Sequence, residues 1–232
     1  MLSNSVRPDA VTAGAPVLAA SYVGWLRDAK RGIYPAAKRL IDVVASAAGI
    51  AVLLPLFVFV AAAIKFESRG PVLFSQTRIG RRGRSFRCWK LRSMYTDAEE
   101  RKAALAAQNE MSGGTLFKMR RDPRVTRIGR LIRKASIDEL PQLWNVLVGD
   151  MALVGPRPPL PAEVALYDAH HRQRLSVRPG ITCIWQVSGR SDIPFEEQVE
   201  MDLAYIKQRS LYFDIKLLLA TVPAVLLARG AY

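Results

Sequence analysis

Two adjacent acids, Asp138 and Glu139, are the residues of this sequence best suited to chemistry. Ser136 stands three residues before Glu139, as in the S-x-x-E capping box, in which the serine caps a helix and the glutamate reaches back to it. This structural interpretation explains Glu139 and leaves Asp138 unexplained. In the first turn of a helix, with Arg133 and Lys134 close by, Asp138 would be held ionised. The pattern therefore leaves two interpretations open: a helix cap, or a carboxylate that serves as a nucleophile or as a Mg²⁺ ligand.

Basic side chains lie on both sides of these acids in the sequence. Lysine and arginine crowd residues 118–134, which include Arg133. Downstream, Pro156 and Pro158 flank Arg157, so that a fixed backbone would pre-organise the direction of its guanidinium. Arginine can bind phosphate in a bidentate manner, which makes these two arginines candidate phosphate ligands. A solvated basic helix followed by a stiff loop is the structural alternative.

The elements that must position these residues begin with an uncharged stretch, Val43 to Ile64, long enough to cross a bilayer as a helix. Two features argue against a straight span. Basic residues flank both ends, and positive flanks favour the cytoplasmic side. Pro55 stands near the middle, where it removes a backbone hydrogen bond and bends a helix. We therefore expect a re-entrant helix over residues 40–66, broken at Leu54 and Pro55, with a straight transmembrane helix as the alternative.

The rest of the chain predicts one small hairpin among helices. Apolar residues alternate on either side of the loop Gly80–Gly83, which predicts a β-hairpin with a basic turn. Asp122-Pro123 is typical of a helix start. After Arg178 we expect a turn, a short strand and a glycine loop. Further helices are predicted over residues 98–108, 196–209 and 214–227, and the last is too short to span a bilayer and better suited to its interface.

Composition points to a membrane surface. The chain has 232 residues, a formal charge of +14 and an isoelectric point of about 10.3, and 50% of its residues are hydrophobic. Basic and apolar residues together favour anionic lipid over nucleic acid as the partner. The two cysteines form no C-x-x-C motif, and the adjacent His170 and His171 cannot build a metal site. We expect residues 1–34 to form a flexible arm and residues 35–232 to form one α+β domain: a mostly helical monotopic membrane protein with a small hairpin and interfacial amphipathic helices.

Four blocks of the sequence resemble one family, in the same order, so that the resemblance covers residues 35–232. The blocks are PVLFSQTRIGRRGRSFRCWKLRSM (71–94), DPRVTRIGRLIRKAS (122–136), SIDELPQLWNVLVGDMALVGPRP (136–158) and VRPGITCIWQVSGRS (177–191). They are similar to the bacterial sugar transferases, which are monotopic polyprenyl-phosphate hexose-1-phosphate transferases. Two positions depart from the family pattern. Leu54 stands where the family commonly has serine, and Cys183 stands where it usually has glycine, so a backbone that needs positive φ there would be strained.

The resemblance implies a reaction in two steps. Asp138 would attack the β-phosphorus of a UDP-hexose, release UMP and hold the sugar phosphate until undecaprenyl phosphate takes it. Mg²⁺ would be bound by Asp138, by Glu139 or by both, and Glu139 could otherwise position Asp138 or assist the incoming phosphate. The phosphate-binding and nucleotide-binding residues that the resemblance implies are Lys90, Arg92, Arg133, Pro156, Arg157, Pro158, Gln186 and Arg190.

The implied place of this reaction is the cytoplasmic face of the bacterial inner membrane, as the first membrane step of exopolysaccharide or capsule biosynthesis. The expected partners are a UDP-hexose, with galactose or glucose favoured, undecaprenyl phosphate and anionic lipids. Interfacial helices could also serve a homodimer, and no nucleic acid is expected. A non-catalytic basic membrane scaffold is the alternative, because it would share the apolar stretch and the charge but would not need Asp138 and Glu139 upstream of Pro-Arg-Pro.

Overall fold

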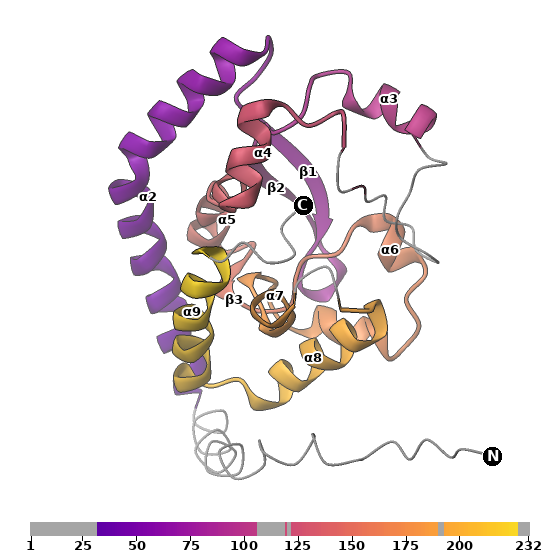
Figure 1. The fold of residues 1–232 in the computed structure, drawn as a ribbon. Coiled ribbons are helices and arrows are strands. Elements are labelled where there is room, and N and C mark those ends of the chain that lie inside the picture. The colour runs from indigo at the N-terminus through magenta and orange to yellow at the C-terminus, as the bar shows by residue number, and fades with distance from the viewer. Residues whose placement is uncertain (1–31, 106–118, 120–121, 190–192, 227–232) are drawn as a thin grey trace, which may run out of the picture.

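The structure, a computed structural model, describes residues 32–105, 119, 122–189 and 193–226. The helices are α2 (Ile33–Glu67), α3 (Ala98–Leu105), α4 (Arg127–Lys134), α5 (Gln142–Val148), α6 (Pro161–Ala165), α7 (Ile184–Ser188), α8 (Phe195–Gln208) and α9 (Leu211–Leu226). The strands are β1 (Leu73–Ile79), β2 (Ser85–Leu91), β3 (Ala152–Val154) and β4 (Gly180–Thr182). Helices therefore predominate, which confirms the expected mostly helical α+β fold (Figure 1).

Helix α2 runs along one edge of the molecule (Figure 1). Among the described helices it alone is long and apolar enough to cross a membrane, with 35 residues, or roughly 50 Å at the helical rise. The expected division into two arms at Pro55 is not seen: the helix continues through the proline, and its axis bends along its length (Figure 1). A proline removes one hydrogen bond but leaves the neighbouring turns intact. The re-entrant path through a bilayer stays a prediction.

A buried polar cluster fastens the first turns of α2 to the rest of the domain. Tyr34 Oη and Lys38 Nζ donate hydrogen bonds to Asp214 Oδ2 at 3.0 and 2.8 Å. Tyr205 Oη donates to the other oxygen of Asp214 at 2.7 Å. The helix therefore begins before the expected domain boundary, and Tyr34 belongs to the domain. Residues 1–31 of the expected arm lie outside the described residues.

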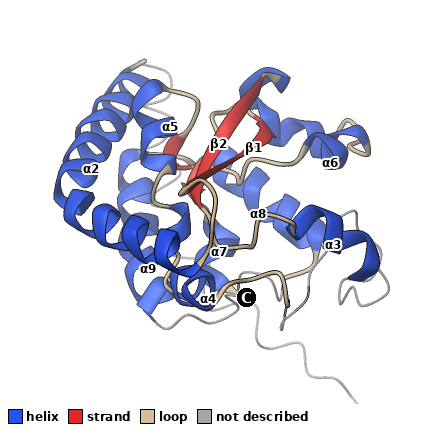
Figure 2. Cartoon of the chain, turned by 90° about the horizontal axis from the view of Figure 1, so that it is seen from above, coloured by secondary structure: helices blue, strands red, loops and turns tan. Residues whose placement is uncertain are grey.

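The expected hairpin is confirmed. β1 and β2 pair antiparallel along their whole length. A 3₁₀ turn at Arg81–Gly83 joins them, and Arg82 and Gly83 take the left-handed conformation with φ of 59° and 76°. In Figure 2 the hairpin lies between α2 and α5 on one side and α6 on the other. The hairpin is thus central, and β2 can contact elements from distant parts of the sequence.

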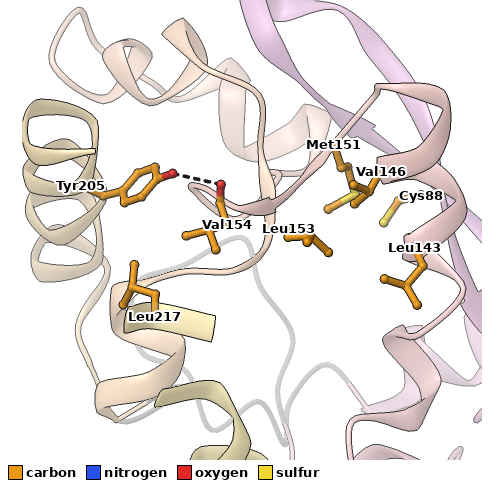
Figure 3. Close-up of a cluster of buried hydrophobic side chains, with 8 residues drawn as sticks. All are labelled: Cys88, Leu143, Val146, Met151, Leu153, Val154, Tyr205 and Leu217. Carbon is orange, nitrogen blue, oxygen red and sulfur yellow. Dashed lines mark hydrogen bonds between the residues drawn. The ribbon is translucent and has the colours of Figure 1, made fainter. Parts of the chain in front are cut away.

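The main hydrophobic core joins the hairpin to the C-terminal half of the chain (Figure 3). β3 and β4 form a parallel pair beside it. A Cβ at Gly180 would lie 2.1 Å from the backbone nitrogen of Gly155, so only glycine allows this approach. Tyr205 Oη donates to Val154 O at 3.1 Å (Figure 3). The buried residues of this core are Cys88, Leu143, Val146, Met151, Leu153, Val154, Tyr205 and Leu217.

Helix α4 begins later than the sequence indicates. Pro123, expected in the first turn of a helix, lies in a separate turn. The helix starts at Arg127, because Thr126 Oγ1 accepts a hydrogen bond from Gly129 N at 2.8 Å and so caps it. The predicted helix start was therefore wrong: a hydroxyl cap, and not the proline, sets the first turn.

The segment after Arg178 is confirmed in part. The predicted strand is β4, but α7 follows it where only a glycine loop was expected. Cys183 precedes α7 with φ of −148°, an extended conformation that any residue adopts. The strain considered for a cysteine at this position therefore does not arise. Helices α3, α8 and α9 confirm the other predicted helices over the described residues.

Candidate active site

The two candidate acids lie in a short 3₁₀ turn, Ile137–Glu139, directly after α4. Ser136 enters this turn in the left-handed conformation, with φ of 55°, and its side chain makes no capping hydrogen bond. The capping-box prediction is therefore wrong. The Glu139 backbone N–H donates to Ser136 O at 3.3 Å, while the Glu139 carboxylate binds elsewhere. A left-handed residue turns the chain sharply, so the acids leave the direction of α4.

A second apolar cluster holds this turn in place. Ile132 on α4 packs with Val60 and Ile64 of α2 and with Leu91 of β2. Ile137, the residue before Asp138, packs against the same cluster. The position of this turn is thus fixed by burial of its first side chain against a cluster to which α2, β2 and α4 all contribute.

Two close contacts fix α4 itself. A Cβ at Gly129 would lie 2.0 Å from Ser93 O, so the helix backbone packs directly on the second residue after the end of the hairpin. Glu67, the last residue of α2, accepts hydrogen bonds from Arg127 N at 2.6 Å and Ile128 N at 2.9 Å. Burial raises the pKa of Glu67, but hydrogen bonds led by that from Ile128 N outweigh it and hold the pKa below its ordinary value. The end of the apolar helix is therefore bonded to the helix that leads to the acids.

A cavity of about 790 Å³ opens beside the 3₁₀ turn. Its wall unites segments that are far apart in the sequence. Of the predicted site residues, Lys90, Arg92, Arg133, Asp138, Glu139, Arg157, Pro158 and Gln186 line it. Pro156 is buried and is not part of the wall, and Arg190 lies outside the described residues.

Glu139 is held by two cations. Lys90 Nζ lies 2.6 Å and Arg157 Nη2 lies 3.1 Å from Glu139 Oε1. Burial alone would raise the pKa of Glu139, but the charges of Lys90 and Arg157 outweigh it and hold the pKa well below its usual range. This carboxylate is therefore ionised and fixed in place.

Asp138 has a different environment from its neighbour. It is 7% exposed and borders the cavity, and no described side chain donates a hydrogen bond to its carboxylate. Burial raises the pKa of Asp138, Lys90 opposes this effect, and the negative charge of Glu139 adds to it. Arg133 favours the ionised form, as expected, but burial outweighs the nearby cations, so the pKa of Asp138 lies above its ordinary value. The side chain has few partners and is free to meet a bound group.

The two predicted arginines nearest the hairpin end have different surroundings. Arg133 donates from Nε to Ser93 Oγ at 2.8 Å and forms no ion pair with a described carboxylate. Arg92 also reaches the wall, but its guanidinium binds the end of α2, with Nη1 to Arg69 O at 2.8 Å and Nη2 to Ser68 O at 2.6 Å. This arrangement favours a structural task for Arg92 and leaves Arg133 available for a ligand.

Sequence reasoning missed Arg78, which also lines the cavity. Its Nη1 donates to Pro158 O at 2.9 Å, so β1 contacts the Pro-Arg-Pro segment directly. Gln76 Oε1 accepts from Arg78 Nε and Nη2 at 3.1 and 2.8 Å. Residues two apart on a strand share a face, so the spacing of Gln76 and Arg78 was the sequence feature that could have indicated this contact.

The donor groups fit Mg²⁺ only if substrate phosphates complete its shell. Among the described residues no cluster of three or more metal-binding side chains exists. Mg²⁺ commonly uses one or two carboxylates together with phosphates. Asp138 offers a carboxylate that no described side chain occupies, whereas Glu139 is engaged by Lys90 and Arg157.

The chain is similar to known proteins along most of its length. The family model described as bacterial sugar transferase matches residues 33–228. Galactosyl transferase CpsE of Streptococcus agalactiae is 47% identical over 196 residues, which cover 84% of this chain and 43% of that protein. Exopolysaccharide production protein ExoY of Rhizobium meliloti is 40% identical over 207 residues, which cover 88% of this chain and 92% of that protein. The UDP-glucose:undecaprenyl-phosphate glucose-1-phosphate transferase of Caulobacter vibrioides is 43% identical over 203 residues, which cover 84% of this chain and 72% of that protein. The chain thus spans less than half of the streptococcal relative, and it belongs to the bacterial sugar transferase family.

Proposed function

We propose that this protein transfers hexose-1-phosphate from a UDP-hexose to undecaprenyl phosphate and releases UMP. The observation that carries the proposal is the Asp138 carboxylate, which borders the cavity beside the cations Lys90, Arg133 and Arg157. Family membership and the Caulobacter relative, named for this kind of transfer, support the same reaction. A relative named for exopolysaccharide production supports a role early in polysaccharide synthesis.

In the proposed first step an oxygen of Asp138 attacks the β-phosphorus of the donor. The bond from this phosphorus to the bridging oxygen breaks, and its electron pair leaves with UMP. A phosphate oxygen of undecaprenyl phosphate then attacks the same phosphorus, and the bond to Asp138 breaks. The carboxylate is regenerated, so one side chain serves a water-soluble donor and a membrane-bound acceptor in turn.

The neighbouring residues position Asp138 and stabilise charge. Glu139 is a positioning residue, because its carboxylate orients Lys90 and Arg157 at the cavity wall. These two cations and Arg133 would stabilise the negative charge on the transferring phosphoryl group. Mg²⁺, held by Asp138 together with the substrate phosphates, would neutralise the diphosphate when bound.

Exposed apolar side chains support a place at the membrane interface, which we propose to be the cytoplasmic face of the inner membrane. α2 and α9 both carry such residues, and the chain is strongly basic, which favours anionic lipid. A lipid acceptor could then reach the cavity without leaving the membrane. The exposed residues are Leu40, Val44, Val52, Leu54, Val58 and Phe59 on α2, and Tyr212, Ile215, Leu219 and Val222 on α9.

The donor sugar is proposed to be galactose or glucose. One relative is named as a galactosyl transferase and another as a UDP-glucose transferase. Both names concern hexoses without an N-acetyl group. A panel of UDP-sugars would identify the donor.

The test is UMP release by detergent-purified protein supplied with a UDP-sugar, undecaprenyl phosphate and Mg²⁺. Asp138→Asn should lower kcat at least about 1000-fold, because an amide cannot form the covalent intermediate. Glu197→Gln, which alters an exposed acid on α8, is the matched control and should keep the wild-type rate. An Asp138→Asn protein that releases UMP at the wild-type rate would overturn the proposal. No observation in the described structure favours the scaffold alternative.

A further inference from the structure

Arg78 differs from most basic residues of the cavity wall because no described carboxylate is paired with it. Lys90 and Arg157 bind Glu139, Arg124 binds Asp122, and Arg174 binds Asp202. Arg92 instead donates to backbone carbonyl groups of Ser68 and Arg69. Arg78 and Arg133 thus carry charges that no ion pair with a described residue balances. Arg133 was already expected at the site, whereas Arg78 was not.

The guanidinium of Arg78 is held by neutral groups. Gln76 Oε1 accepts from Nε and Nη2, and Pro158 O accepts from Nη1. A guanidinium has five N–H groups, so one on Nη1 and one on Nη2 have no acceptor among the described residues. The free N–H groups of one planar guanidinium can donate to phosphate oxygens. Arg78 is therefore pre-organised for an anion.

Arg78 also lies beside the segment that carries Arg157. It contacts Pro158, the neighbour of Arg157, and Ile79 N donates to Pro159 O at 2.9 Å. Burial and then the charge of Arg157 lower the pKa of Arg78, and the charge of Glu163 opposes them. A half-buried cation beside a second cation is costly unless an anion joins them. The cavity wall therefore favours binding of a further negative group, in addition to the Glu139 carboxylate that Arg157 contacts.

We propose that Arg78 binds the α-phosphate of the donor nucleotide, which is the phosphate that leaves with UMP. This inference rests on the proposed function. When the β-phosphorus separates from the bridging oxygen, the electron pair stays on that oxygen and the charge of the leaving phosphate increases. Arg157 is bound to Glu139 beside Asp138, so a second cation one step along the wall is placed to stabilise the leaving group.

The test compares UMP and uridine as ligands in titration calorimetry, with detergent-purified wild type and Arg78→Gln. Arg78→Gln should bind UMP at least tenfold more weakly and uridine equally well, because only UMP has the phosphate. The KM for the UDP-sugar should rise while the KM for undecaprenyl phosphate stays constant. Arg84→Gln changes an exposed arginine of the same hairpin and should leave all of these values unchanged. Arg78→Lys keeps the charge but not the fork, and its UMP affinity should lie between wild type and Arg78→Gln.

Several results would overturn the inference. UMP affinity that is unchanged in Arg78→Gln would do so, as would an equal loss for UMP and uridine, which indicates a structural role. A rise confined to the KM for undecaprenyl phosphate would move Arg78 to the acceptor. If Arg78→Gln is unfolded at the temperature of the titration, Arg78→Lys is measured in its place. A UMP affinity equal to that of the wild type in Arg78→Lys would then contradict the inference. If the wild type releases UMP and Arg78→Gln binds UMP normally, the inference on Arg78 is wrong and the proposed function stands. If the wild type is inactive with every donor, both the proposed function and the inference are wrong.

Discussion

The two ends of helix α2 meet the rest of the protein by different chemistry. At its beginning, Tyr34 and Lys38 enter a buried polar cluster around Asp214, away from the cavity wall. At its end, Glu67 accepts hydrogen bonds from α4, and Arg92 binds the carbonyl groups of Ser68 and Arg69, which directly follow the helix. The first end holds the fold together, and the second also sets the position of the elements that carry the acids. We therefore expect substitutions at the two ends to separate stability from catalysis.

The largest effect on stability should follow from Asp214→Ala. Removing this carboxylate leaves the Tyr34 hydroxyl without its acceptor and takes one partner each from Lys38 and Tyr205, so the free energy of unfolding should fall by about 3–5 kcal/mol. The kcat of the folded protein should change less than about twofold, because the cluster does not border the cavity. Chemical denaturation in detergent and UMP release at low temperature measure both. A loss of kcat in fully folded protein would contradict the purely structural role of this end of α2. Glu197→Ala is the surface control.

Arg92→Met should have a smaller effect on stability and an additional effect on catalysis. The carbonyl groups of Ser68 and Arg69 lose their donor, which should cost about 2–3 kcal/mol. Because Ser93, the next residue, binds Arg133, kcat should also fall several-fold. Arg87→Met, at an exposed position of the same strand, is the control. Wild-type kcat in the folded variant would show that the end of α2 does not set the site.

Glu67→Gln should give the smallest effect, and that effect should depend on pH. Its pKa is lowered in the folded protein, so the carboxylate contributes stability above its unfolded pKa, and this contribution is lost as the pH falls below that value. At pH 7 the variant should be about 1 kcal/mol less stable than wild type, and the difference should shrink below a pH of about 4. Unfolding free energies at pH 7 and at acidic pH, with the exposed Glu100→Gln as control, test this. A difference that stays constant or grows in acid would contradict it.

The sequence predicted the features that depend on local signals. The hairpin follows from alternating residues around Gly80–Gly83, and the apolar helix follows from the uncharged stretch Val43 to Ile64. The convergence of Lys90, Arg133, Asp138 and Arg157 on one wall was predictable only through the family resemblance, because no local pattern joins these segments.

The features that sequence reasoning missed depend on tertiary contacts. Ser136 matches a cap motif, yet its backbone is left-handed and the next residue, Ile137, packs against a cluster from α2, β2 and α4. Arg92 lies in a run that resembles substrate-binding sequence, yet the nearby end of α2 takes up its donors. The availability of Arg78 depends on the absence of a facing carboxylate among the described residues, and no sequence pattern records that. The periodicity of hydrophobic residues and the residue types of turns do not show which distant segments come into contact.

The contact between Gly129 and Ser93 has a consequence for surveys of variants. Any side chain at Gly129 would have to push α4 away from Ser93 O, from which a Cβ would be only 2.0 Å. A screen scored by polysaccharide production alone would therefore rank Gly129 beside Asp138, although Gly129 is not part of the cavity wall. Protein abundance measured in parallel would distinguish the two, because the Gly129 variants should be lost from the cell whereas Asp138→Asn should accumulate as intact, inactive protein.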